Sequence, residues 1–431
     1  MSRILILASK LGYQTRSFAE VALALGLEVV FASDRCHQLD DPWADGAIAV
    51  QFDQPEDAAR RIVQQSLARP LDGLIALGDR PTVAAAYVAR ALRIPYNSPA
   101  AVENCRSKLR QREVLREAGL PVPGFFSFRI DKRLEKILPR VQFPCVVKPL
   151  RLAASQGVIR ANDPGEFQDA VERIRLLLKS PEIQVTREGE LDRVIVERYI
   201  PGAEVAVEGL LTRGKLRTLA IFDKPDPLEG PYFEETIYVT PSRQPEQMQE
   251  RIADCAAATV RALGLTHGPV HAEFRVNEQG PWVLEASPRP IGGLCSRALR
   301  FGPERILLET LLVRHAMAMP DSDLDRESDA SGVMMIPVPK TGVLQGVEGE
   351  EKARATPGVD GVEITARLHD FLAAWPEGST YLGFIFARAK SPEQAEVALR
   401  LAHSALKFEI AERLPVEHPV TGTLPHAGTR D

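Results

Sequence analysis

The first 104 residues alternate short apolar runs with longer amphipathic segments, and this alternation constrains the fold more than any other feature of the chain. The apolar runs predict strands at 4–8, 29–32, 47–52 and 74–77, and the amphipathic segments predict helices at 15–25, 55–68 and 81–92. Strands that alternate with helices form parallel sheets with crossover connections. We therefore expect a Rossmann-like domain over 1–104. The turn at 9–12 has a single glycine, so the GxGxxG pattern is absent and an NAD-dependent enzyme is disfavoured.

Composition narrows the class of protein further. The 431 residues are 26% charged, with both signs mixed and a net charge of -5. No basic block favours nucleic acid as a partner, and no polybasic stretch favours an anionic membrane. The five cysteines are widely spaced and form no CxxC pair, which predicts reduced thiols in the cytoplasm rather than disulfides or a zinc knuckle. The apolar start is too short for a signal peptide, and no run approaches the roughly 18 apolar residues of a membrane span.

The rest of the chain predicts further domains. Ser107 is expected to cap a helix that ends at Gly119. Further helices are predicted at 166–179, 245–263 and 392–407, and strands at 333–338, 361–367 and 381–389. Residues 181–193 are expected to form a mobile polar loop, and the acidic segment 321–332 a linker. We expect a multidomain α/β and α+β fold with domains at 1–104, 105–320 and 333–413, the last a small α+β unit, and a frayed tail at 414–431.

Residues 271–293, with the sequence HAEFRVNEQGPWVLEASPRPIGG, are the most informative segment for function. They predict a hairpin over 269–288 with a three-residue loop at 278–280, in which Gly280 takes the left-handed position. The opposed pairs are then Asn277 with Pro281, Arg275 with Val283, Glu273 with Glu285, and His271 with Ser287. Directly opposed carboxylates destabilise a sheet unless a cation lies between them, and Mg2+ prefers such oxygen ligands. A hairpin with both glutamates in solvent is the alternative.

The residues after the second strand favour a ligand site over a solvated hairpin. Arg289 lies two residues past Ser287, on the same face of the strand, where its guanidinium can hold anionic oxygens in a bidentate grip. Gly292 and Gly293 allow the backbone to approach a ligand closely.

Two lysines are candidates for binding phosphate. Lys148 ends a buried strand and is followed by a loop of small residues at 153–158, and such loops can cover phosphates through backbone N–H groups. Lys108 lies in the first turn of its helix, where a cation opposes the helix dipole unless its side chain reaches a phosphate. A surface lysine at 108 and a lysine at 148 that extends its ammonium group to solvent are the alternatives.

The apolar strand that starts at 194 breaks at Pro201-Gly202 and resumes at Glu204. The exposed backbone groups at such a break can pair with a flat ring, and an ordinary β-turn is the alternative.

Taken in order, these motifs resemble the ATP-grasp superfamily over about 105–325. The resemblance lies in Lys108, Lys148, SQGV at 155–158, ERYIPGAE at 197–204, HAEF at 271–274 and EASPR at 285–289. The segment 223–242 and the C-terminal domain are similar to the L-amino-acid ligase branch. The resemblance implies a Rossmann-like pre-ATP-grasp domain and a two-lobed ATP-grasp domain that holds ATP between its lobes, with the lid at about 142–203.

The resemblance also implies roles for individual residues. Those expected at the nucleotide are Lys108 and Lys148 at the phosphates, Ser155, Gln156 and Gly157 in the covering loop, Glu197, Arg198, Tyr199 and Ile200 at adenine, and Glu204 at the ribose. Glu273 and Glu285 would hold Mg2+. Ser287 stands where many family members have Asn, and a hydroxyl is a weaker metal ligand than an amide carbonyl. Arg289 would steady an acyl phosphate.

The implied activity is an ATP-dependent carboxylate–amine ligase that acts on small molecules, with amino acids as the expected substrates and a homodimer as a possible assembly. The candidates for gripping the amine or accepting its proton are His271, Glu234 and Glu235, with Gly292 and Gly293 beside the substrate. A structural histidine is the alternative for His271. A bicarbonate-using ATP-grasp carboxylase or carbamoyl-phosphate-type enzyme is one alternative function, and a non-catalytic nucleotide-binding regulator is another.

Overall fold

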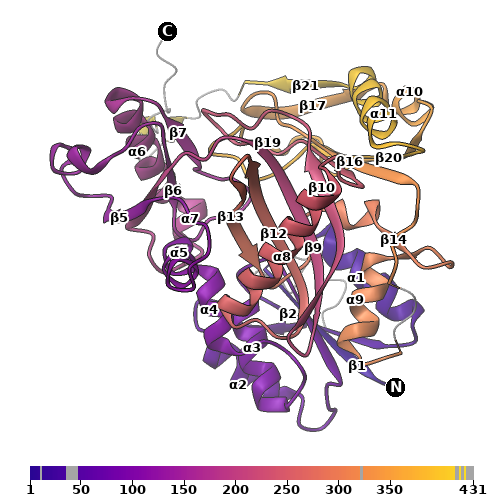
Figure 1. The fold of residues 1–431 in the computed structure, drawn as a ribbon. Coiled ribbons are helices and arrows are strands. Elements are labelled where there is room, and N and C mark those ends of the chain that lie inside the picture. Colours follow the sequence, from indigo (N-terminus) through magenta and orange to yellow (C-terminus); the bar gives the residue numbers. More distant parts are fainter. Residues whose placement is uncertain (10–11, 35–46, 321–323, 413–416, 419–421, 424–431) are drawn as a thin grey trace.

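The computed structural model describes residues 1–9, 12–34, 47–320, 324–412, 417–418 and 422–423 (Figure 1). The expectations for residues 10–11 of the first turn, Cys36, the start of the linker at 321–323 and most of the tail at 414–431 fall outside these residues. Among the described helices, none combines the length and the apolar character that a membrane span requires.

The N-terminal domain is built on a parallel sheet of order β3-β2-β1-β4. Its strands are β1 Arg3–Ala8, β2 Glu28–Ser33, β3 Ala47–Ala49 and β4 Gly73–Leu77, and its helices are α1 Tyr13–Ala24, α2 Pro55–Gln65 and α3 Thr82–Leu92. Every residue of β4 is buried, as expected for a parallel strand covered on both faces. The Rossmann-like prediction is confirmed, although the third strand is shorter than predicted.

Two helices connect this domain to the next part of the chain. Helix α4 (Pro99–Arg106) was not predicted, although Ser98 accepts a hydrogen bond from the Ala101 N–H at 3.2 Å and Pro99 occupies the first helical position. Helix α5 (Lys108–Glu117) begins where predicted. Ser107 occupies the N-cap position, as predicted. Its hydroxyl makes no capping hydrogen bond, so the predicted side-chain cap is wrong.

A separate antiparallel sheet of order β5-β8-β6-β7 is formed by residues 125–198. Its elements are β5 Phe125–Arg129, β6 Cys145–Pro149, β7 Ile159–Ala161 and β8 Arg193–Arg198, with short 3-10 turns at Leu134–Lys136 and Leu138–Arg140 and helices α6 Pro164–Leu178 and α7 Pro181–Gln184. The segment predicted as a loop at 181–193 thus starts with a short helix.

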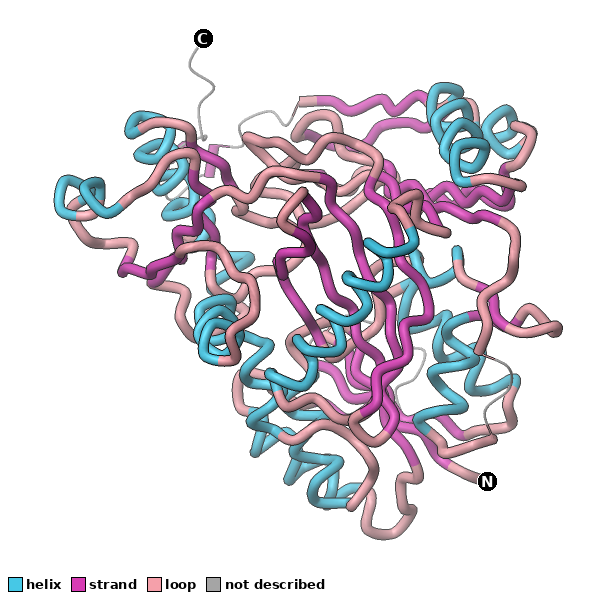
Figure 2. Tube along the Cα trace, in the orientation of Figure 1, coloured by secondary structure: helices cyan, strands magenta, loops and turns pink. Residues whose placement is uncertain are grey.

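The largest sheet has eight strands in the order β13-β12-β9-β10-β11-β16-β20-β18. Their bounds are β9 Ala203–Thr212, β10 Lys215–Lys224, β11 Ile237–Thr240, β12 Gly268–Asn277, β13 Gly280–Ser287, β16 Ala330–Ile336, β18 Val359–Ile364 and β20 Gly383–Ala389. Helix α8 (Glu246–Leu263) lies across this sheet, as Figure 2 shows, and buries Ile252, Ala256 and Val260 against it.

The C-terminal part is more closely joined to the chain before it than the predicted appendage. Strands β16, β20 and β18 extend the large sheet, because β11 pairs with β16. The predicted linker also ends early, since β16 begins at Ala330. The remaining elements are the 3-10 turn Cys295–Ala298, α9 Leu308–Ala316, α10 Glu350–Arg354, α11 Pro392–Ala405, and strands β14 Arg300–Phe301, β15 Ile306–Leu307, β17 Gly342–Glu348, β19 Phe371–Leu372, β21 Lys407–Ala411, β22 Glu417–His418 and β23 Gly422–Thr423.

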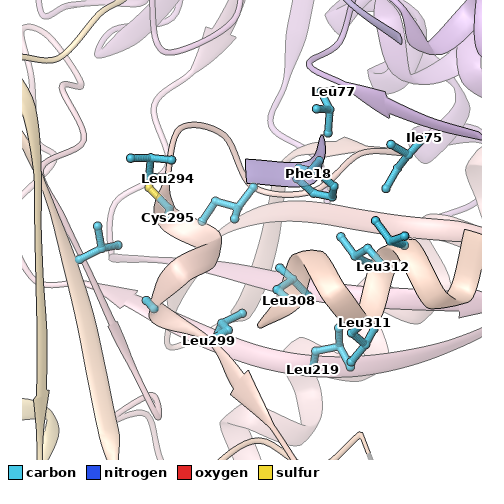
Figure 3. Close-up of a cluster of buried hydrophobic side chains, with 14 of the residues drawn as sticks. Phe18, Ile75, Leu77, Leu219, Leu294, Cys295, Leu299, Leu308, Leu311 and Leu312 are labelled. Atoms are coloured by element: carbon cyan, nitrogen blue, oxygen red, sulfur yellow. The ribbon is translucent and has the colours of Figure 1, made fainter. Parts of the chain in front are cut away.

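A shared hydrophobic core joins the N-terminal domain to the large sheet (Figure 3). Phe18 and Leu77 come from the N-terminal domain, while Leu219, Leu294 and Leu312 come from the segments that pack against it. Burying a side chain of this size contributes about 1.5–3 kcal/mol. The core therefore fixes the end of β4 beside the end of the hairpin.

Candidate active site

A cavity of ≈ 310 Å³ lies where the N-terminal sheet, the sheet β5-β8-β6-β7, the hairpin and the C-terminal strands meet. The predicted site residues that line it are Lys108, Lys148, Ser155, Glu197, Arg198, Tyr199, Ile200, Glu204, Glu235, His271, Glu273, Glu285, Ser287, Arg289, Gly292 and Gly293. Gln156, Gly157 and Glu234 are not among its lining residues. The structure thus brings together most of a site that is spread over nearly 200 positions of the sequence.

The turn of the hairpin differs from the prediction. Asn277 pairs with Gly280, so the loop contains two residues rather than three. Arg275 consequently pairs with Trp282 and not with the predicted partner. Gly280 does have a positive φ, of 118°, which favours glycine at this position.

A β-bulge restores the predicted pairing at the functional end of the hairpin. The register shifts between Phe274 and Glu273, which leaves Leu284 as the extra residue. Beyond it, Glu273 pairs with Glu285, as predicted, and both line the cavity. Bulges re-aim side chains, and this one turns the carboxylate pair into the cavity in spite of the shorter turn.

Each of the two glutamates has a cation beside it. The ammonium of Lys108 lies 3.4 Å from Glu285 and also donates to the Leu152 carbonyl at 2.7 Å. The ammonium of Lys224 lies 3.2 Å from Glu273. The like charges of the opposed pair are therefore balanced by basic groups from two other elements.

Lys224 is the centre of a buried cluster of three carboxylates. Its ammonium lies 2.7 Å from Glu204 and 2.5 Å from Glu235, as well as near Glu273, and only 2% of the side chain is exposed. Burial works to lower the pKa of Lys224, but Glu204 and its neighbours raise it well above its ordinary value. Burial and Glu273 raise the pKa of Glu235. The cluster places a permanent cation among the acids that line the cavity.

Glu204 is held more firmly than its predicted ribose role requires. One carboxylate oxygen accepts from Lys224, and the other accepts from the Arg275 guanidinium at 2.9 Å. A carboxylate retains further lone pairs when each oxygen accepts one bond. Contact with a ribose hydroxyl therefore stays a prediction for this residue.

Glu197 was expected at adenine, but its carboxylate is engaged elsewhere. It accepts from the Arg112 guanidinium at 2.6 Å and from the Lys148 ammonium at 2.7 Å, and its side chain is 3% exposed. Burial opposes its ionisation, yet Arg112 and Lys148 lower the pKa of Glu197 to about 2. Arg112 also donates to the Leu284 carbonyl at the bulge, at 2.7 Å. Glu197 therefore fixes Lys148 at the cavity wall.

Arg289 is held by an acidic residue of the N-terminal domain. Its Nε and Nη2 atoms donate to the two carboxylate oxygens of Asp79, at 2.9 and 3.1 Å. Burial works against ionisation of Asp79, but Arg289 lowers its pKa well below the usual range. Ser287 helps to lower the pKa of this carboxylate as well.

His271 lies between two carboxylates. Its Nδ1 atom contacts Glu208 and its Nε2 atom lies 3.2 Å from Glu273. Burial works to lower the pKa of His271, but Glu208 and then Glu273 raise it to about 9. A histidine that is protonated at neutral pH cannot accept a proton from an amine, so this arrangement disfavours the predicted role as a base.

The small-residue loop has internal bonds, from the Gln156 N–H to the Ala153 carbonyl at 3.2 Å and from the Val158 N–H to the Ser155 carbonyl at 3.1 Å, and it also contacts the C-terminal segment. Gln156 Nε2 donates to the Glu377 carbonyl at 2.6 Å, and the Gly157 N–H donates to the Pro376 carbonyl at 2.9 Å. Trp375 Nε1 donates to the Ala154 carbonyl at 3.2 Å. The Gln156 side-chain amide and the Gly157 N–H thus anchor the loop to the C-terminal segment. Neither group is free to make the predicted phosphate contact in this structure.

Glu234 and Glu235 point to different environments. Glu235 lines the cavity, whereas Glu234 is half-buried beside Val338 and one of its oxygens has no hydrogen-bond partner. Burial raises the pKa of Glu234 to about 7, against the effect of the Val338 N–H. Glu234 is not among the residues that line the cavity, and its substrate role stays a prediction.

One wall of the cavity is aromatic and apolar. It includes Tyr13 from the N-terminal domain, Tyr238 and Met335 from the large sheet, and Tyr381 from the C-terminal segment. Gly293 closes this wall with a φ of 65°, and an added Cβ would lie 2.8 Å from the Phe384 ring. This wall can accept an apolar group next to the charged half of the cavity.

Asp79 and Lys224 line or complete the site but were missed in the sequence. Lys224 ends a buried strand and precedes a proline, which is the same signal that singled out Lys148. Asp79 follows the carboxyl end of β4, where open α/β sheets bind their ligands. Both signals were available, but Asp79 lies in no recognised motif, and within the segment 223–242 only Glu234 and Glu235 were chosen as candidates.

Three family models match the chain. They are the ATP-grasp N-terminal domain over 19–96, the ATP-grasp domain over 141–298 and the L-amino acid ligase C-terminal domain 2 over 334–411. The chain therefore belongs to the ATP-grasp superfamily, as its motifs and its two-lobed site indicate.

Within that superfamily the chain is L-amino-acid ligase-like. It is similar to the crystal structure of L-amino acid ligase from Bacillus licheniformis, with a TM-score of 0.77 and 26% identity over 96% of this chain and 99% of that chain. The resemblance drawn from the sequence is confirmed.

Two curated relatives match a smaller part of the chain. The uncharacterized protein y4rH of Sinorhizobium fredii is 25% identical over 75% of this chain and 65% of its own length. Alanine–anticapsin ligase of Bacillus subtilis is 27% identical over 53% of this chain and 51% of its own length. The chain thus spans less than two thirds of the length of either relative.

Proposed function

We propose that the chain is an ATP-dependent ligase that phosphorylates a substrate carboxylate and couples it to an amine, with release of ADP and phosphate. The observation that carries this proposal is the content of one cavity, which combines two phosphate-directed lysines, a facing pair of glutamates and Arg289. The names of the similar proteins, L-amino acid ligase and alanine–anticapsin ligase, support the same reaction class.

Lys108 and Lys148 are the proposed phosphate ligands. Their ammonium groups are held by Glu285 and Glu197 at 3.4 and 2.7 Å, so both enter the cavity from fixed positions. The adenine ring would contact the segment from Arg198 to Ile200, which includes Tyr199. Positioning and charge neutralisation account for most of phosphoryl-transfer catalysis, and fixed cations supply both.

Glu273 and Glu285 fit a Mg2+ site. Both offer hard carboxylate oxygens from paired positions of the hairpin, on the wall that carries the lysines. Oxygens of Glu273, Glu235 and Glu204 also lie within 4.8 Å of one another. Bound Mg2+ would neutralise the charge on the phosphate oxygens. We propose that Ser287 supports Asp79 rather than the metal, because it favours the charged form of this carboxylate.

The reaction follows from these positions. An oxygen of the substrate carboxylate attacks the γ-phosphorus, the bond to the β-phosphate oxygen breaks, and ADP leaves. The amine nitrogen then attacks the acyl carbon, loses a proton, and phosphate leaves. Arg289 would donate hydrogen bonds to the oxygen on which negative charge develops.

The lid protects an acyl phosphate from water. We propose a lid lobe over about 142–203, within an ATP-grasp domain at 105–320, because the sheet β5-β8-β6-β7 is separate from the large sheet. Its loop is anchored to the C-terminal segment at Trp375 and Glu377. The C-terminal part therefore helps to close the site.

We propose amino acids as the substrates, at least one with an apolar side chain. The aromatic wall formed by Tyr13, Tyr238 and Tyr381 suits such a group and has no function for bicarbonate. Glu235 is the proposed partner for the substrate ammonium, since it lines the cavity and Glu234 does not.

An ADP-release screen over pairs of amino acids, with products identified by mass, tests the function. Activity should require both a carboxylate and an amine, and Glu285→Gln should abolish it while the fold remains intact. Glu278→Gln is the matched control, because Glu278 is exposed in the turn of the same hairpin. ADP release that requires bicarbonate alone, or nucleotide binding without turnover of any pair, would contradict the proposal.

A further inference from the structure

The loop that follows β4 contacts both Arg289 and the lid. We infer that Asp79 is a positioning residue that orients Arg289, and that the adjacent Arg80 couples this orientation to docking of the lid through Glu188. The role of Arg289 in the reaction rests on the proposed function. The contacts that join Arg289 to the lid through Asp79 and Arg80 do not depend on that function.

Asp79 determines which N–H groups of Arg289 remain for a ligand. A guanidinium has five N–H donors. Two donate to Asp79, at 2.9 and 3.1 Å, and one from Nη1 donates to the Pro290 carbonyl at 3.0 Å. The two that remain are one on each terminal nitrogen. Since Asp79 takes the Nε side of the group, its outer edge is left to receive a pair of anionic oxygens.

The pair is placed for geometry more than for stability. The side chains of Arg289 and Asp79 are 14% and 13% exposed. A buried ion pair recovers little more than its desolvation cost, so such a pair is weak grounds for a stabilising role. Asp79 lies two residues after the end of a fully buried strand whose last residues, Ala76 and Leu77, pair with β1. Asp79 therefore holds Arg289 in a fixed position relative to the rigid sheet of the N-terminal domain.

The next residue along the chain holds the lid. Arg80 donates from Nε to Glu188 at 2.6 Å and from Nη2 to the Thr186 carbonyl at 2.8 Å. Arg106 donates to the other oxygen of Glu188 at 2.9 Å. The side chains of Arg80 and Glu188 are only 17% and 10% exposed, so these bonds are shielded from water. The lid segment around Glu188 and the guanidinium of Arg289 therefore share one support, the backbone of Asp79 and Arg80.

Asp79→Asn tests the positioning role, because it preserves size and removes the paired acceptor. We expect kcat to fall by about 10- to 100-fold while the KM for ATP changes by less than about threefold, since misplacement of a transition-state donor affects the chemical step. Asp72→Asn, at the other end of the same strand, is the control. A wild-type kcat in Asp79→Asn would overturn the inference. A rise in the KM for ATP as large as the fall in kcat, together with a lower thermal stability, would overturn it too, because it would indicate a merely structural residue.

A binding measurement makes the test independent of turnover. Calorimetric titration of inorganic phosphate into the enzyme loaded with MgADP should show about tenfold weaker binding in Asp79→Asn, with ADP affinity unchanged. If the wild-type chain ligates no amino-acid pair, the proposed function fails while this titration still decides the role of Asp79. Unchanged phosphate affinity would refute it.

Glu188→Gln tests the lid contact. With ATP bound, trypsin should cleave after the exposed Arg187 several-fold faster than in wild type, and more ADP should form per molecule of product, because water reaches the site. Glu182→Gln, exposed on the same lobe, is the control. Unchanged cleavage and unchanged coupling in Glu188→Gln would overturn the proposed link to the lid.

Discussion

Lys224→Met should cause a large loss of stability, because it removes the cation of a buried acidic cluster. The ammonium lies 2.7, 2.5 and 3.2 Å from oxygens of Glu204, Glu235 and Glu273, and the side chain is 2% exposed. Methionine has a similar length and no charge. The substitution therefore leaves three acids facing one another without their shared cation.

The magnitude follows from the contacts. At an effective dielectric constant near 20, one charge pair at 2.7 Å is worth about 6 kcal/mol, and desolvation of the ammonium offsets several kcal/mol of the total. Uptake of a proton by Glu235 relieves part of the repulsion. Breaking a buried pair typically costs 3–5 kcal/mol, and we expect a loss of about this size in the free energy of unfolding.

Chemical denaturation monitored by fluorescence measures the effect, with and without millimolar Mg2+. Because oxygens of the three acids lie within 4.8 Å of one another, Mg2+ should restore part of the lost stability in Lys224→Met and have a smaller effect on wild type. Lys215→Met, exposed at the start of the same strand, should cost no more than about 0.5 kcal/mol. Equal stability of Lys224→Met and wild type, or the absence of any added protection by Mg2+, would refute this reasoning.

Three further predictions concern residues in or near the cavity. The pKa of Glu234 is raised from 4.5 to about 7, so its contribution to stability is present below pH 4.5 and is lost as the pH rises through 7. The free energy of unfolding of Glu234→Gln should therefore equal that of wild type in acid and exceed it by about 1–2 kcal/mol at pH 8, after allowance for partial exposure. Activity should be unchanged, and a loss of activity would place Glu234 at the substrate. Gly293→Ala should lower the free energy of unfolding by about 1–3 kcal/mol, because its φ is positive and the Phe384 ring is 2.8 Å from the new methyl group. The methyl group added in Gly292→Ala has no atom within 4 Å, so stability should be unchanged, while the KM for the larger amino acids should rise. A KM that does not depend on side-chain size would show that Gly292 does not contact the substrate.

The paired glutamates show why some of the site was predictable. The pairing of Glu273 with Glu285 depends on a two-residue period, which the sequence displays directly. The turn and the bulge at Leu284 introduce opposite shifts of one residue, so the prediction reached the right pairing from a wrong loop. A bulge depends on neighbouring strands and on the bond from Arg112 to the Leu284 carbonyl, and no local pattern encodes these.

Other parts of the site depend on contacts between distant segments. Asp79 meets Arg289 only because the core around Phe18 and Leu312 packs the N-terminal sheet against the segment after the hairpin. The alternation in the first 104 residues predicted that sheet, but not what lies at its carboxyl edge. Lys224 carried a usable signal, a lysine and a proline at the end of a buried strand, and was missed because that signal was applied only to Lys148.

The pairing of β11 with β16 determines how this enzyme can be cut and recombined. A chimera that exchanges everything after residue 320 would divide one hydrogen-bonded sheet between two parents. If the incoming strand did not match Ile237 and Val239, the free edge would be open to other chains and prone to aggregation. Transplanting specificity from a relative therefore calls for grafting single loops onto the intact sheet and not for swapping modules.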